Sequence, residues 1–305
     1  MTTLRIAFVG SESSQTQCEV AAKRIRDVEI IRCNDPSDCA TPNFAAACNA
    51  VVFDHREAAN VESIRSLVEQ RKHLLVSPAM WKEKSAAELL GIARQNHTIL
   101  LPNRSWRFQP AAEAMKEQLD NDQLGAAGLL RIHRWLSCGA EQSLAESLLP
   151  DVDLACWLFN DEPNVLYATS RDDSSFGDTH SADPECSWRY VQVHFGFPNG
   201  GSAVIDCCLD LPAGDEYHSA SLIGSRGAIY SDDHRDRQLL FGRDGVTAPK
   251  ADYGHLAMAA QLRAFAHICR SGIFENITVQ DEMDRVWRVL SRINESIANR
   301  VSVAS

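Results

Sequence analysis

The sequence lacks several features that would define its class at once. Although it contains ten cysteines, it has no Cys-x-x-Cys pair. It has no apolar run of the roughly 18 residues that a membrane span needs. Its first residues, Met-Thr-Thr-Leu-Arg, show no basic segment, apolar core or cleavage site of a secretory signal. We therefore expect a cytoplasmic protein with reduced, mostly buried thiols, no membrane association and no metal site.

Other absences narrow the chemistry. The chain has no Gly-x-Ser-x-Gly elbow and no Walker loop, and no cysteine and histidine stand at a recognisable spacing for a nucleophile pair. Its formal net charge of -11 is spread along the sequence. A spread negative charge disfavours nucleic acid and anionic membranes as partners. With 305 residues, of which 45% are hydrophobic, the chain is long enough for two packed domains.

The stretch from Leu4 to Arg26 predicts a strand, a turn and a helix of the kind that receives a dinucleotide. A dinucleotide-binding turn uses three glycines, for the tight turn, for close approach of the diphosphate and for helix packing. Only Gly10 is present, and the other two positions carry Glu12 and Gln15. The turn is thus either an unusual phosphate-binding loop or a scaffold turn kept for folding. The Glu12 carboxylate could compete with an anion for the helix N-terminus.

A second strand, Val28 to Cys33, is followed by Asn34-Asp35-Pro36. An acidic residue at this place binds the adenosine ribose in NAD-using domains, which makes Asp35 a candidate. The alternative is that Asp-Pro simply begins a turn.

Apolar strands and helical patterns alternate up to about residue 122. This alternation predicts a Rossmann-like α/β domain, residues 1–122, with a parallel sheet and helices on both faces. The segment Pro36 to Cys48 is too short and too rich in small residues for a full crossover helix, so part of one layer is expected to be trimmed. The remaining predicted elements are Ala50 to Phe53, Val61 to Val68, His73 to Ser77, Ala86 to Ala93 and Thr98 to Leu101.

The pattern changes near Gly125, where strands begin to follow one another directly. Residues 123–305 are therefore predicted to form an α+β domain with a large, mostly antiparallel sheet. The expected strands are Leu129 to Leu136, Val165 to Ser170, Trp188 to Phe197, Ser202 to Leu211, His218 to Leu222 and Ala228 to Ser231, and helices close the chain at His255 to Arg270 and Val279 to Arg300.

Several strings, taken in order, resemble the glucose-fructose oxidoreductase, inositol dehydrogenase and MocA family (Gfo/Idh/MocA), over nearly the whole chain. The family's "GKHVLCEKP" looks like Arg71-Lys-His-Leu-Leu-Val-Ser-Pro78, and "RFHPA" looks like Arg107-Phe-Gln-Pro-Ala111. The "GELG" turn looks like Asp122-Gln-Leu-Gly125, and "WLFGEP" looks like Trp157 to Pro163. The hairpin "GTEG" looks like Gly224 to Gly227.

The resemblance implies an NAD(P)-dependent oxidoreductase whose Lys and Asp-x-x-x-His pair handle a proton beside the nicotinamide. Carried over residue by residue, the Lys falls on Ser77 or Pro78, the Asp on Glu146 and the His on Pro150. Only the carboxylate survives, because serine does not titrate near neutrality and proline has no side-chain proton. This chain therefore departs from the family as a divergent member.

Other candidates lie where the strands of such a domain end. The substrate candidates are Asn103, Arg104, Trp106 and Arg107, since the two arginines could hold a carboxylate or phosphate, although Arg107 alternatively supports a hinge. His133 is, with Glu146, a weak catalytic candidate. We place Gly10, Glu12, Asp35, His55 and Pro78 at the cofactor, while His55 alternatively faces solvent.

Three hypotheses follow. In the first, the dehydrogenase site has decayed and the interdomain crevice binds another small molecule. In the second, the protein is an active NAD(P)-dependent oxidoreductase on a sugar or polyol, with Glu146 or His133 transferring the proton. In the third, the large sheet is an assembly surface of a homodimer or larger homo-oligomer.

Overall fold

The chain folds into two compact units, Met1–Gln109 with Tyr253–Arg285, and Pro110–Asp252 with Val286–Ser305. The structure is a computed structural model that describes residues 3–39, 41–54, 60–82, 85–137, 144–172, 189–211, 217–232, 237–242, 245–247, 255–272 and 276–304. Within these residues, no helix has both the length and the apolar character needed to cross a membrane.

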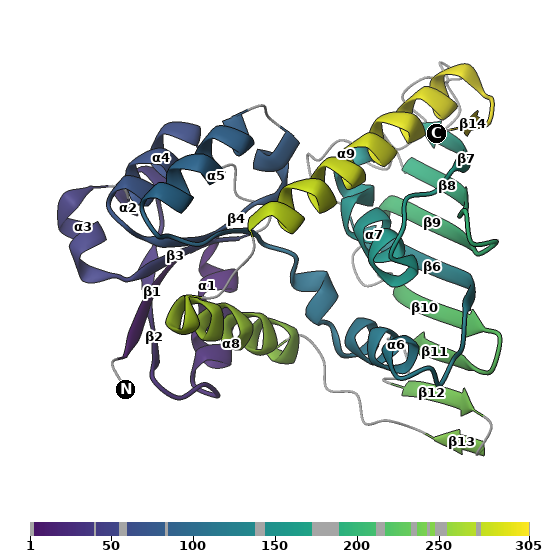
Figure 1. Cartoon of the computed structure of the whole chain (residues 1–305), viewed down its shortest axis with the longest axis horizontal. Helices are drawn as coiled ribbons and strands as arrows, with labels where there is room; N and C mark the ends of the chain where they lie inside the picture. The colour runs from purple at the N-terminus through teal and green to yellow at the C-terminus, as the bar shows by residue number, and fades with distance from the viewer. Residues whose placement is uncertain are drawn as a thin grey trace, which may run out of the picture. The chain divides into compact units, whose positions relative to one another are not determined.

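The first unit contains a parallel sheet with the strand order β2-β1-β3-β4-β5 (Figure 1). Short apolar runs form these strands, and β1, β3 and β4 are almost completely buried. This confirms the predicted Rossmann-like sheet. The strands are β1 (Leu4–Val9), β2 (Val28–Cys33), β3 (Ala50–Phe53), β4 (His73–Val76) and β5 (Leu100–Pro102).

Helices cover both faces of this sheet, as predicted (Figure 1). Helix α4 (Val61–Glu69) shows why they form, since Asn60 caps its N-terminus and Ile64, Leu67 and Val68 bury one face at helical spacing. The other long helices are α1 (Glu12–Ala22), α5 (Ser85–Gln95) and α8 (His255–Ser271), and two 3-10 turns, η1 (Pro78–Lys82) and η2 (Ser105–Phe108), follow β4 and β5.

The segment after β2 holds only two short helices, α2 (Pro36–Cys39) and α3 (Pro42–Ala47). Within the described residues β2 is the last strand on its side of the sheet. A dinucleotide-binding sheet with the order 3-2-1-4-5-6 continues with one more strand at this place. The short segment between Cys33 and Ala50 leaves too few residues for that strand and its helix.

Helix α8 belongs to the first unit, whereas we predicted it within a second domain of residues 123–305. It packs against α1 and η2. Two hydrogen bonds fasten it, from Gln261 Nε2 to Asn103 Oδ1 at 2.9 Å and from Arg270 Nη2 to the carbonyl of Asp27 at 2.7 Å. These contacts join residues far apart in the sequence, so local patterns could not indicate them.

In the second unit, the described strands form one mixed sheet with the order β13-β12-β11-β10-β6-β9-β8-β7-β14. Only β6 and β9 pair in parallel, so the predicted mostly antiparallel sheet is confirmed. The strands are β6 (Ala127–Ser137), β7 (Val165–Asp172), β8 (Arg189–Gly196), β9 (Ser202–Leu211), β10 (Tyr217–Gly224), β11 (Ala228–Asp232), β12 (Arg237–Gly242), β13 (Gly245–Thr247) and β14 (Val303–Ala304).

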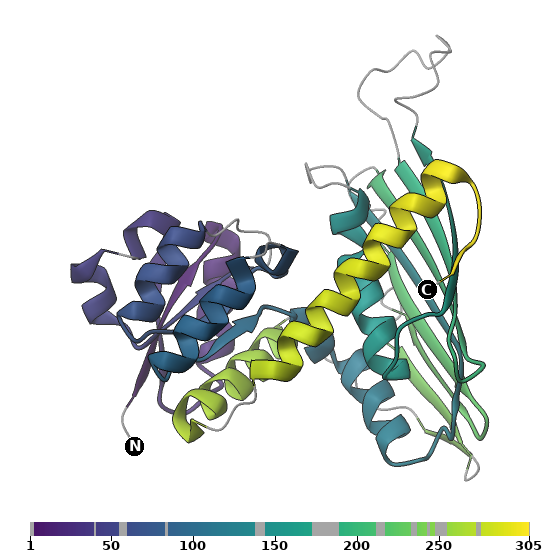
Figure 2. The ribbon, with the colours of Figure 1, turned by 45° about the horizontal axis from the view of Figure 1, so that its top comes forward.

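Helix α7 (Leu144–Phe159) lies on one face of this sheet and contacts β6, β9 and α6 (Pro110–Asp120) (Figure 2). Alternate residues such as Leu130 and Ile132 are buried beneath it, and the residues between them point to the opposite, outer face. Helix α9 (Asn276–Asn299) contributes its first residues to the first unit and the rest to the second.

Candidate functional site

The turn after β1 is built around Gly10 and Asp54. A Cβ atom on Gly10 would lie 3.0 Å from Asp54 Cβ and 3.4 Å from Asp54 Oδ2. Glycine therefore suits this position, because a Cβ atom would press on the Phe8 ring, also at 3.0 Å, and on the residue that follows β3. Asp54 is not among the predicted site residues, although an acidic residue directly after a buried parallel strand is a signal that identifies such positions.

Gln15, at the third glycine position, is buried under the first turn of α1. Its Nε2 donates hydrogen bonds to the carbonyls of Gly10 and Cys33, both at 2.9 Å, and to Asn34 Oδ1 at 3.0 Å. A glycine at this position lets the helix pack closely on the strand. Here an amide side chain fills that space and links the carboxyl ends of β1 and β2.

Two side chains, those of Ser11 and Glu12, lie at the N-terminus of α1, where a phosphate would have to bind. Ser11 caps the helix, and its Oγ accepts a hydrogen bond from the N–H of Ser14 at 3.2 Å. Glu12 is the first helical residue and is exposed. A carboxylate at this position is stabilised by the helix dipole and repels a second anion.

Asp35 follows β2 and is exposed. Its backbone carbonyl accepts hydrogen bonds from the thiol of Cys33 and from the N–H of Asp38, both at 3.1 Å. The residue thus ends the strand and begins α2, which agrees with the turn interpretation. Its position at the end of β2 also agrees with ribose binding, so both interpretations stay open.

The positions that correspond to the family's Lys are buried. Ser77 is 3% exposed, and its Oγ accepts a hydrogen bond from the N–H of Ala79 at 3.4 Å. Pro78 is buried and begins η1. Neither side chain supplies a group that titrates near neutral pH.

The predicted substrate residues are held by internal partners. Buried Asn103 donates to the carbonyl of Phe53 at 2.7 Å and accepts from Gln261. Trp106 is also buried. Arg104 and Arg107 both direct Nη1 to Oε2 of Glu282 on α9, the second at 3.1 Å. Glu282 is not among the predicted site residues, because it lies 178 positions from Arg104 in the sequence.

In the second unit the two weak catalytic candidates are not brought together. Glu146 lies in the first turn of α7, and its side chain falls outside the described part of the chain; Pro150, at the family's His position, lies inside the same helix. His133 points to the outer face of the sheet, away from α7. Its Nδ1 lies 3.0 Å from Oδ2 of Asp206.

Asp206 also accepts hydrogen bonds from the Tyr190 hydroxyl at 2.9 Å and from Gln192 Nε2 at 2.6 Å. Burial, together with the bond to Asp206, raises the pKa of Tyr190 to about 12. The pairing follows from the strand register, which sets Asp206 opposite both His133 and Gln192. The group is a satisfied polar network on the outer face.

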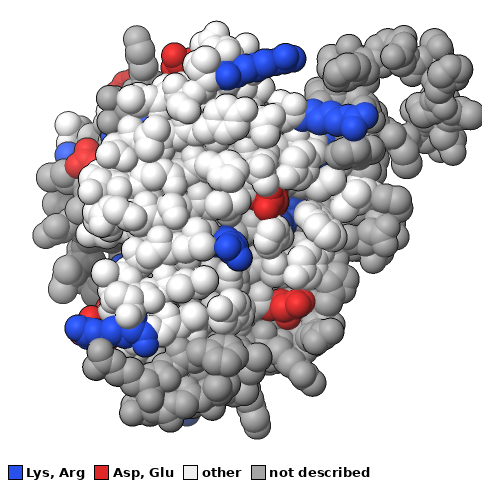
Figure 3. Space-filling model, turned by 90° about the vertical axis from the view of Figure 1, so that its right-hand side faces the viewer, with Lys and Arg blue, Asp and Glu red and all other residues white. Residues whose placement is uncertain are grey.

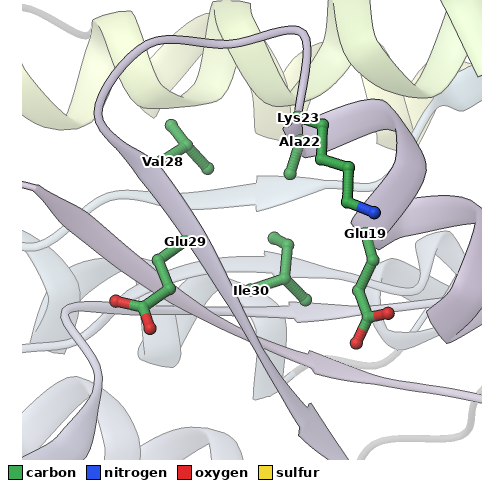
Figure 4. A pocket seen from close by; sticks show the side chains of 6 residues that line it. All are labelled: Glu19, Ala22, Lys23, Val28, Glu29 and Ile30. Carbon is green, nitrogen blue, oxygen red and sulfur yellow. The ribbon is translucent and has the colours of Figure 1, made fainter.

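A hollow of 240 Å³ lies elsewhere on the first unit, beside the first half of β2 (Figure 4). The predicted cofactor residues follow the carboxyl ends of the strands, so this hollow does not coincide with them. Its side chains come from α1, from the residue directly after α1 and from β2, and are Glu19, Ala22, Lys23, Val28, Glu29 and Ile30.

Two other expectations concern His55 and metals. His55 falls outside the described residues. Among the residues that are described, no group of three or more His, Cys, Asp or Glu side chains is arranged to hold a metal ion.

No protein-family model matches the sequence, and no curated protein matches it significantly. Solved structures do match the fold. Scyllo-inositol dehydrogenase from Lactobacillus casei, solved with NAD(H) and scyllo-inositol, has a TM-score of 0.73 at 13% identity over 99% of both chains. Myo-inositol 2-dehydrogenase from Lactobacillus plantarum matches with a TM-score of 0.73 at 14% sequence identity, over 99% of both chains. An Agrobacterium radiobacter oxidoreductase, solved with NAD+, L-tartaric acid and magnesium, matches with a TM-score of 0.72 at 17% sequence identity. The match covers 99% of this chain and 98% of that one.

At such identities the likeness establishes the fold alone. The chain has the fold of the inositol and sugar dehydrogenases of the Gfo/Idh/MocA type, with a Rossmann sheet in one unit and a large mixed sheet in the other.

Proposed function

We propose that this chain is a divergent Gfo/Idh/MocA protein whose hydride-transfer site has decayed, and that it binds a small molecule in a binding or regulatory role. The observation that carries the proposal is the buried amide of Gln15, which fills the space that glycine leaves open in a dinucleotide-binding turn.

Electrostatics supports the same conclusion. Glu12 at the start of α1 and Asp54 beside Gly10 place two carboxylates at the turn that would hold the diphosphate. Each carboxylate close to a phosphate weakens binding by about 1–2 kcal/mol, or roughly five- to thirtyfold. The residues present therefore do not fit the diphosphate of NAD or NADP.

The catalytic positions support it independently. Ser77 and Pro78 stand where the family has Lys, and Pro150 stands where it has His. General acid-base catalysis needs a group whose pKa lies near the working pH, and none of these three side chains has one.

Titration with NADH and NADPH, followed by nucleotide fluorescence, tests the proposal. We expect no binding at micromolar concentration, and micromolar affinity for either nucleotide would overturn it. In Glu12→Gln with Asp54→Asn, affinity should rise. Glu62→Gln, which removes a carboxylate from the first turn of α4, is the matched control and should have no effect.

A second candidate is an active NAD-dependent oxidoreductase on a sugar or polyol, with Asp35 at the ribose and Glu146 or His133 transferring the proton. Its support is that several proteins of this fold were solved with NAD or NADH. It predicts micromolar nicotinamide binding and a change of absorbance at the nicotinamide band with some polyol. A broad polyol screen with neither would reject it.

We also propose that the protein is a homodimer or larger homo-oligomer formed through the outer face of the large sheet. Among the described residues, four exposed large hydrophobic side chains lie there, Trp135, Val165, Tyr167 and Tyr230. Figure 3 shows this face with charged side chains few and scattered. An extended, weakly charged face of this kind is typical of a subunit interface.

A further inference from the structure

The two arginines of the segment after β5 share one carboxylate oxygen. Nη1 of Arg104 and Nη1 of Arg107 both contact Oε2 of Glu282, and the arginine side chains are only 14% and 11% exposed. Glu282 is 36% exposed. The two guanidinium groups thus converge on one point that solvent reaches from the side of the glutamate.

The backbone segment that carries the two arginines is ordered by its own turn and by a neighbouring helix. They flank buried Trp106 in η2, the N–H of Arg107 donates to the carbonyl of Arg104 at 3.0 Å, and η2 packs against α8. The segment follows the carboxyl end of a parallel strand, where open α/β sheets bind their ligands. Guanidinium groups match the planar geometry of carboxylates and keep their charge at any working pH.

We propose that Arg104 and Arg107 form a binding site for the carboxylate of a small organic acid, and that Glu282 occupies this site as an internal carboxylate which the ligand displaces. The inference deepens the proposed small-molecule binding role, on which it rests, by naming the ligand class.

Glu282 can leave without a change of backbone. Its side chain is the most exposed of the three, and rotation about its own bonds moves the carboxylate into water. An internal competitor that occupies the site 90–99% of the time lowers the apparent affinity of an external carboxylate about ten- to a hundredfold. Removing its charge therefore exposes the intrinsic affinity of the two arginines.

Isothermal titration calorimetry of the nucleotide-free full chain tests this with L-tartrate and with threitol, its neutral analogue in which hydroxymethyl groups replace the carboxylates. We expect Glu282→Gln to bind L-tartrate at least tenfold more tightly than the wild type. Glu282→Asp, whose shorter side chain competes less well, should lie between them. Threitol should not bind, and added salt should weaken the binding of tartrate.

The controls separate this site from a purely structural ion cluster. Glu295→Gln removes an exposed carboxylate from the same helix and should leave the affinity unchanged. Adding Arg104→Gln or Arg107→Gln to Glu282→Gln should abolish the gain. Urea unfolding checks that each variant is folded. If Glu282→Gln does not fold, the comparison of Glu282→Asp with the wild type still tests the inference.

No gain in folded Glu282 variants, a gain that survives loss of either arginine, or equal binding of threitol would overturn the inference. Because no nucleotide is present, its failure is distinguishable from failure of the decayed-site proposal, which depends on NADH titration.

Discussion

At the scale of single residues, Gln15 shows how one buried side chain can join the ends of two neighbouring strands, β1 and β2. The two amide hydrogens are shared among three oxygens, and the side chain has almost no contact with solvent that could replace these bonds. A group of this kind is costly to remove because the carbonyls it served stay buried.

We predict that Gln15→Glu destabilises the protein and does so more at pH 7.5 than at pH 4.5. The introduced carboxylate faces oxygen acceptors, so folding raises its pKa, and a raised carboxyl pKa means that stability falls as the pH rises above the unfolded value of about 4.3. Urea unfolding at the two pH values, compared with the wild type, measures this. Equal destabilisation at both would contradict it.

Buried thiols are a second feature at this scale. Burial raises the pKa of Cys18 and of Cys207 to about 12 from 9.0. A raised thiol pKa contributes stability that is present below the unfolded pKa and is lost as the pH rises toward the folded one.

Each of these two thiols is expected to reduce the free energy of unfolding by about 1 kcal/mol between pH 9 and pH 10. Urea unfolding of Cys18→Ala and Cys207→Ala under reducing conditions should show a shallower decline over this range. Ser13→Ala, an exposed position on α1, is the control and should keep the slope of the wild type. Unchanged slopes in both cysteine variants would disprove the assignment.

At the scale of elements, one buried ion pair fixes α7 on the large sheet. Arg134 of β6 contacts Asp151 of α7 through Nη2 at 2.6 Å and Nε at 2.9 Å, and Asp151 is 2% exposed. Burial opposes the charge of Arg134, and attraction to Asp151 outweighs it, so the pKa of Arg134 is raised. The helix is thus oriented by a pair that water does not screen.

Asp151→Ala should lower the free energy of unfolding by about 3–5 kcal/mol, because it leaves the guanidinium of Arg134 buried without this partner. Glu88→Ala breaks the exposed pair of Glu88 on α5 with Arg65 on α4 and should cost no more than about 1 kcal/mol. Urea unfolding of both variants makes the comparison. Similar losses in the two would show that burial does not decide the energy of these pairs.

At the scale of the whole molecule, the outer face of the large sheet bears on assembly. Tyr167 and Tyr230 both lie on this outer face, on β7 and β11 near opposite edges of the sheet, and are 40% and 41% exposed. If subunits associate through this face, a charge at either place becomes buried without a partner.

Light scattering should therefore find an oligomer for the wild type and a monomer for Tyr167→Glu combined with Tyr230→Glu. Val20→Glu places the same charge on an exposed hydrophobic site of α1, in the other unit, and should stay oligomeric. A wild-type monomer at high concentration would remove the proposal.

Hydrophobic periodicity predicts most of the elements and the two kinds of sheet, because it is a local property that the chain carries into any environment. It did not predict α6, α7, β12, β13 or β14. The sequence also predicts the turn at Gly10, and its resemblance to the Gfo/Idh/MocA family predicts that the family's Lys and His are replaced. The contacts that the site residues make across the fold, in contrast, follow from the tertiary structure. Gln15 meets Cys33, Gly10 meets Asp54, and Arg104 meets Glu282 because packing joins distant segments. Strand alternation points His133 and Ile132 to opposite faces of the sheet, and the packing of α7 on one face makes Ile132 the buried residue.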